Sequence, residues 1–177
     1  MELRQKGSEA NVGGFKQLMV TMKWTTAADF DLAAAYEAKD GKQGLLYFGE
    51  LGDLNAFPFM QLSGDEGVGD SGGENEEVMR IAKLDDMKYV WLLCWDYGKV
   101  KEGGPARFKE SDVSLSVVDD KGGSFDLSLD TGDLGNVAVL ATIDNSNPIG
   151  AKLANTSKAG TLKGLNNLDQ LIDIIQN

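Results

Sequence analysis

Carboxylates are the side chains of this sequence that could do chemistry as a group, and they gather in one segment. Eight Asp and Glu residues lie between Gln43 and Met79, where there is no Lys or Arg. Six of them fall within residues 65–77, and five glycines lie at positions 64–73. Two carboxylates about 4 Å apart repel each other by about 4 kcal/mol at an effective dielectric constant near 20. A folded loop that holds these acids together therefore needs a cation, and without one it stays open and solvated.

A loop in which glycines and acidic residues alternate is suited to binding a hard cation. Glycine reaches positive φ without steric cost, so backbone carbonyls can turn inward. Ca²⁺ takes about six to eight oxygen ligands, which carboxylates and carbonyls can supply. Residues 63–77 therefore predict a calcium-binding loop. A solvated, disordered loop is the alternative reading, since such loops are also rich in Gly and acid.

A second acidic element favours the hypothesis that the chain binds calcium. Asp29 and Asp31 flank Phe30 at the start of a predicted strand. Residues two apart in a strand point to the same face, so both carboxylates would lie side by side in an apolar neighbourhood. That arrangement is costly unless they share a proton, a metal or a basic partner. A solvated strand end is the alternative.

Composition excludes several other kinds of site. The chain has no His and a single Cys, Cys94, so it has no His-based nucleophile system, no imidazole metal site and no internal disulfide. Its net charge of −11 argues against nucleic acid as a partner, because phosphate binding needs a basic patch. The lone Cys and the absence of an apolar signal segment at the start of the sequence predict a cytoplasmic protein.

The hydrophobic pattern predicts a mostly β fold, a β-sandwich of two antiparallel sheets in a single domain over residues 1–177. Short stretches alternate between apolar and polar residues, and turn signals such as Asp40-Gly41 separate them. Residues 89–95 are apolar on both faces and predict a central buried strand. A C-terminal amphipathic helix is expected over residues 166–176, packed on the sandwich. The expected strands are residues 18–24, 30–38, 44–48, 78–84, 89–95, 113–117, 125–129 and 137–143.

The two acidic elements resemble a known family. Residues 29–36, Asp-Phe-Asp-Leu-Ala-Ala-Ala-Tyr, are similar to the D-x-D-L-x-A element of TerD-type tellurium-resistance and stress proteins. Residues 64–77, with their Gly-Asp start, glycine-acid centre and acidic end, resemble the acidic loop of that family. The continuation after residue 36 looks closest to the TerA-like branch. The similarity extends over about residues 29–95 and weakens on either side.

The resemblance implies a calcium-binding, non-enzymatic stress-response module in which Ca²⁺ lies between the D-x-D strand and the acidic loop. It also implies tellurium resistance, protein partners in a stress-response assembly, and peripheral association with the inner membrane. Ser71 and Gly72 depart from a stricter alternation of acid and glycine in the family, which puts a second calcium ion in doubt. Glu66 and Glu77 are left as outer-shell or solvated groups. The implied ligands are Asp29, Asp31, Asp65, Asp70, Glu74 and Glu76, with backbone oxygens of Gly67, Val68 or Gly72 completing the shell.

Two other functions stay open. An interaction or scaffold domain could bind a basic partner through the acidic loop without metal. A carboxylate-based hydrolase or a Mg²⁺-dependent phosphoryl-transfer enzyme is a third candidate. The sequence offers little for the enzyme, because it has no P-loop pattern and no basic residue in the acidic segment to stabilise a developing phosphate charge.

Overall fold

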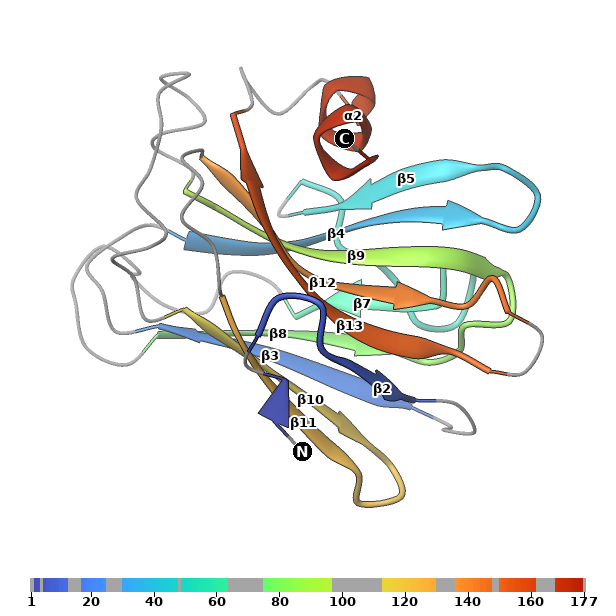
Figure 1. Cartoon of the computed structure of the whole chain (residues 1–177). Helices are drawn as coiled ribbons and strands as arrows, with labels where there is room; N and C mark the ends of the chain where they lie inside the picture. The colour runs from blue at the N-terminus through green and yellow to red at the C-terminus, as the bar shows by residue number, and fades with distance from the viewer. Residues whose placement is uncertain are drawn as a thin grey trace.

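The computed structural model shows two β-sheets stacked face to face, with a short helix on the outside of one of them (Figure 1). The mostly β sandwich expected from the sequence is therefore confirmed. The residues that the structure describes are 2–3, 5–12, 17–24, 30–47, 49–63, 75–96, 113–129, 136–147, 150–161 and 168–176.

Sheet A has the strand order β1-β11-β10-β3-β8-β7-β6. Its pairings are antiparallel except that β1 runs parallel to β11, so the sheet is mixed where two antiparallel sheets were expected. Its strands are β1 (Glu2–Leu3), β3 (Leu18–Trp24), β6 (Gly52–Asp53), β7 (Met60–Leu62), β8 (Asn75–Ile81), β10 (Ser114–Asp119) and β11 (Ser124–Ser128).

Sheet B has the order β2-β13-β12-β9-β4-β5, and all its pairings are antiparallel. The expected hairpin at Asp40-Gly41 joins β4 to β5, and Gly41 adopts φ +93° in the turn, which glycine does without strain. Its strands are β2 (Glu9–Asn11), β4 (Phe30–Ala38), β5 (Gln43–Leu46), β9 (Met87–Asp96), β12 (Val137–Asp144) and β13 (Lys152–Gly160).

Two apolar cores cover the two faces of sheet B. The inter-sheet core lies between the sheets and takes one side of β4 and β9, with Leu32 and Leu92 among its members. The outer core lies on the opposite face and takes the other side of the same strands, with Trp91 and Trp95. This explains why β9 is apolar on both faces, as the sequence predicted for residues 89–95.

Helix α2 (Leu168–Gln176) covers the outer core. It lies near the top of Figure 1, against the outside of sheet B. Its buried side chains Leu171, Ile172 and Ile175 follow the three- and four-residue spacing that predicted this packing. Of the helices in the described part of the chain, none is long and apolar enough to cross a membrane.

Two sequence expectations need correction. The strand expected over residues 78–84 is β8, which begins at Asn75 and ends at Ile81. The short strands β1, β2, β6 and β7 were not expected, and neither was β13, although it is nine residues long. The reason is that β13 places Asn155 and Ser157 at buried positions, where an apolar residue would have produced the alternating pattern.

Asn155 forms a polar bridge between the sheets. From β13 in sheet B, its Nδ2 donates to the carbonyl oxygens of Leu3 (2.6 Å) and Ser128 (2.9 Å), which belong to adjacent strands of sheet A. The Ser157 hydroxyl donates to Asn155 Oδ1. Both side chains are almost fully buried, and these hydrogen bonds offset the cost of removing them from water.

Candidate functional site

Strand ends from both sheets meet at one end of the sandwich, called the acidic end here (left side of Figure 1). In sheet A, Trp24 at the end of β3 pairs with Asn75 at the start of β8. In sheet B, Phe30 at the start of β4 pairs with Asp96 at the end of β9. β4 and β8 contact each other across the two layers. In the sequence, Asp29 directly precedes β4 and the predicted acidic loop directly precedes β8.

Glu77 is a charged residue that points between the sheets. It pairs with Met22, whose side chain is fully buried, and lies on the same face of β8 as Met79 and Ile81. Its own exposure is 8%. Its Oε2 accepts a hydrogen bond from the backbone N–H of Leu32 at 2.5 Å. A carboxylate on sheet A therefore holds the start of β4 in sheet B.

By accepting the Leu32 N–H, Glu77 gives β4 a hydrogen-bond partner beyond the part of the strand that pairs with β5. β5 pairs with residues 34–37 of β4, so the N–H of Leu32 lies past the end of that ladder. A buried backbone N–H without a partner costs about 1–3 kcal/mol, and a hydrogen bond to a charged group contributes about 1.5–3 kcal/mol. Glu77 therefore stabilises the strand that carries Asp31.

Asp31 is also buried, with 7% exposure, but on the other face of β4. It pairs directly with Trp95 and shares its face with Ala33 and Ala35, both members of the outer core. The apolar neighbourhood expected for this carboxylate is therefore confirmed. Asp31 and Glu77 approach the start of β4 from opposite faces of the strand.

Glu76 points away from both. It pairs with Lys23 on the outward face of sheet A, and its Oε2 lies 3.8 Å from Lys23 Nζ. The Glu76 side chain is 55% exposed and that of Lys23 is 62% exposed. Such an exposed ion pair contributes little to stability.

The structure thus separates the predicted site residues. Asp31 and Glu76 are described, and they point to different surfaces of the sandwich. The sequence analysis left Glu77 as an outer-shell or solvated group. Glu77 is buried, so the prediction that it is solvated is wrong. Its place in the period-two series with Met79 and Ile81 is the sequence signal that would have identified it. The other predicted ligands lie outside the described residues: Asp29, Asp65, Gly67, Val68, Asp70, Gly72 and Glu74.

The donor chemistry at this end fits a hard cation. Asp31 and Glu77 offer carboxylate oxygens, which suit Ca²⁺ or Mg²⁺ better than a softer metal. Within the described ranges, no group of three or more His, Cys, Asp or Glu side chains is arranged to hold a metal ion. Ca²⁺ needs about six to eight oxygens, so a complete site here requires the acids of residues 29 and 65–74 in addition.

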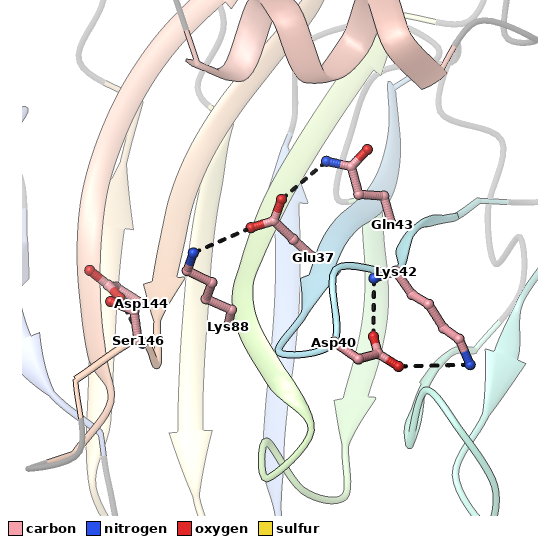
Figure 2. Close-up of polar contacts among 7 residues, drawn as sticks. All are labelled: Glu37, Asp40, Lys42, Gln43, Lys88, Asp144 and Ser146. Atoms are coloured by element: carbon pink, nitrogen blue, oxygen red, sulfur yellow. Dashed lines mark hydrogen bonds and ion pairs between the residues drawn. The ribbon is translucent and has the colours of Figure 1, made fainter.

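Acids at the opposite, hairpin end of the sandwich have a different role. Figure 2 shows Asp40 beside Lys42, and Glu37 between Lys88 and Gln43. Each of four aspartates accepts a hydrogen bond from the backbone N–H two residues later, which closes a turn. These are Asp40 (3.0 Å), Asp53 (2.7 Å), Asp119 (2.9 Å) and Asp144 (2.9 Å).

Two of the solved chains that match share this fold over most of their length, although no family model and no curated protein matches the sequence. One is the crystal structure of a homologue of the telluride resistance protein TerD from Streptomyces coelicolor A3(2). Its TM-score is 0.54 at 16% identity, over 92% of this chain and 98% of that one. The other is a protein of unknown function, SAV2460, with a TM-score of 0.51 at 14% identity over 82% of this chain and 92% of that one. The chain therefore has a TerD-like fold, and the resemblance to the TerD-type family is supported at the level of the fold.

Proposed function

We propose that this chain is a calcium-binding, non-enzymatic module and that Ca²⁺ binds at the acidic end. Asp31 would supply a buried carboxylate from β4, and the acids of residues 29 and 65–74 would supply the remaining charge. Glu77 would position β4 through its hydrogen bond to Leu32. The TerD-like fold and the absence of any Lys or Arg between Gln43 and Met79 support this proposal.

Bound calcium would neutralise the clustered acids and order the acidic segment. A ligand that binds only the folded state stabilises that state by mass action. The ordered segment would then form the surface that protein partners recognise. We further propose a cytoplasmic role in stress response, including resistance to tellurium compounds, within a protein assembly near the inner membrane. The name of the S. coelicolor homologue supports the link to tellurium.

The observation that carries the proposal is the burial of two carboxylates, Asp31 and Glu77, around the start of one strand. Both carboxylates already have partners within the chain. A cation bound beside them would stabilise the buried negative charge further.

Isothermal titration calorimetry on EDTA-stripped protein tests this proposal. Wild type is expected to bind Ca²⁺ in preference to Mg²⁺, and Asp31→Asn is expected to weaken binding at least tenfold. Wild type that takes up no calcium at millimolar concentration would overturn the proposal and favour a metal-independent interaction domain.

The adjacent residues Glu76 and Glu77 form a matched pair for locating the site. Because Glu77 holds the strand that carries Asp31, Glu77→Gln is expected to weaken calcium binding, and Glu76→Gln on the outward face of sheet A is not. If Glu76 is a ligand, as the family resemblance implies, the order will reverse. Circular dichroism spectra of both variants check that the fold is retained.

A further inference from the structure

The outward faces of the two sheets differ in what covers them. Helix α2 covers the outward face of sheet B, whereas in the described part of the chain no helix lies on sheet A (Figure 1). The outward side chains of four adjacent strands of sheet A are called the open face here. They are Glu76, Val78 and Arg80 of β8, Met19, Thr21 and Lys23 of β3, Ser114, Ser116 and Val118 of β10, and Ser124, Asp126 and Ser128 of β11.

The centre of the open face is neutral and partly apolar. Met19 lies between Arg80 and Val118 in the register, and it is 38% exposed. Among the described residues, the exposed large apolar side chains are Met19 and Phe57. Around Met19 lie small hydroxyl and apolar side chains of β3, β8 and β10. Neutral side chains cost far less to remove from water than charged ones, so this centre can be buried by a partner.

The charges on the open face are nearly balanced, although the chain as a whole carries −11. Lys23 and Glu76 lie opposite each other and form an ion pair. Arg80 and Asp126 are the other charged side chains of the face, and Glu2 of β1 adds one negative charge at its edge. Two molecules of this net charge repel each other, so two copies would meet most readily over a surface of little net charge.

Arg80 and Asp126 have no ion pair or side-chain hydrogen bond among the described residues. They lie three strands apart, and the register offsets them by two residues along the strand direction. At about 4.8 Å between strands and 3.4 Å per residue, their Cα atoms are separated by about 16 Å. The two side chains therefore cannot reach each other within one molecule.

A two-fold axis would pair these two charges between molecules. The midpoint between Arg80 and Asp126 falls between β3 and β10, at the neutral centre of the open face. An axis that lies in the plane of the face, passes through this point and is perpendicular to the line joining the two residues places Arg80 of each copy against Asp126 of the other. The same rotation brings Lys23 of each copy near Glu76 of the other. The face is thus complementary in charge to a second copy of itself.

We propose that the open face is an interface between two copies of this chain. The dimer buries the centre around Met19 and forms two Arg80–Asp126 ion pairs at its rim. Four strands over about six residues cover about 400 Å² per copy, which is less than the roughly 800 Å² per partner of a stable interface. The dimer is therefore weak, with a Kd of about 100 µM. This inference does not depend on the proposed calcium site.

Sedimentation equilibrium of the full chain, from about 10 µM to 1 mM and in EDTA, tests the proposal. Wild type is expected to form a dimer over this range. Arg80→Glu and Asp126→Arg are each expected to weaken it at least tenfold, because like charges then meet at the rim. Wild type that stays monomeric at 1 mM would overturn the proposal.

A mixture of the two variants tests the two-fold arrangement. In a dimer of Arg80→Glu with Asp126→Arg, both rim contacts again join opposite charges, so a 1:1 mixture is expected to dimerise within about threefold of wild type. Lys152→Glu makes the same charge change on sheet B as Arg80→Glu makes on sheet A, and it should leave the Kd within about twofold. A mixture that stays monomeric, or an equal loss in Lys152→Glu, would overturn the interface. Circular dichroism spectra and thermal melts confirm that each variant is folded.

Discussion

The two ends of the sandwich use acidic residues in opposite ways. At the hairpin end, Asp40, Asp53, Asp119 and Asp144 accept backbone N–H groups in their own turns, and their charges remain near solvent. At the acidic end, Asp31 and Glu77 are buried on either side of one strand. An acid in a turn needs only local backbone, whereas a buried acid needs a compensating group. This difference is why we propose that a cation binds at the acidic end rather than at the hairpin end.

The largest effect is expected from the neutral bridge between the sheets. Asn155→Ala removes donors from the buried carbonyl oxygens of Leu3 and Ser128 and an acceptor from the Ser157 hydroxyl. We expect a loss of about 3 kcal/mol in the free energy of unfolding, measured by urea denaturation. Because the bridge carries no charge, the loss should be equal in Ca²⁺ and in EDTA. A calcium-dependent loss would contradict the assignment of Asn155 to structure alone.

Glu77→Ala tests in the same way the hydrogen bond by which Glu77 of sheet A holds β4 of sheet B. The variant leaves the Leu32 N–H without its acceptor and is expected to lose about 2 kcal/mol in EDTA. The loss should grow in Ca²⁺, because β4 then no longer holds Asp31 in place for the cation. Urea denaturation of wild type and variant under both conditions measures it. Equal losses with and without calcium would separate Glu77 from the metal site.

Much of the fold could be predicted from the sequence. Alternation predicted most strands of both sheets, and the spacing of Leu171, Ile172 and Ile175 predicted the packing of α2. Strand β13 was missed because its buried positions carry Asn155 and Ser157, whose hydrogen bonds come from strands distant in sequence. Sequence periodicity cannot reveal such partners.

The acidic end shows the same limit on a smaller scale. The sequence predicted that acids gather there, and the family resemblance implied Glu76 as a ligand and left Glu77 as an outer-shell or solvated group. The period-two series of Glu77, Met79 and Ile81 indicates that Glu77 faces inward. Its partner, the backbone N–H of Leu32, lies on a strand of the other sheet and cannot be predicted from periodicity.

A turn acid at the hairpin end provides the next comparison. Asp119 Oδ1 accepts the N–H groups of Lys121 and Gly123, so Asp119→Ala is expected to lose about 1 kcal/mol. Asp119→Asn keeps an acceptor and should lose less. Urea denaturation is again the measurement, and neither loss should depend on calcium. A calcium-dependent loss would mean that the hairpin end also binds the ion.

The smallest effect is expected from the exposed pair on the outer face of sheet A. Lys23→Gln removes the 3.8 Å contact with Glu76 and should change the free energy of unfolding by less than about 0.5 kcal/mol. The change should decrease further in high salt, because exposed pairs are screened. A larger, salt-independent change would show that this face is less solvated than the contact indicates.

The most direct test of the account is the calcium-dependent shift in melting temperature of two charge-matched double variants. Asp65→Asn/Glu74→Gln removes two acids from the predicted calcium loop, and Asp40→Asn/Asp144→Asn removes two from the hairpin end. At a calcium concentration about 100 times Kd, wild type should gain about 2.7 kcal/mol, or roughly 5–10 °C. We predict that the hairpin-end variant retains this shift and that the loop variant loses it. Equal shifts in both variants, or no shift in wild type, would contradict a calcium site at the acidic end.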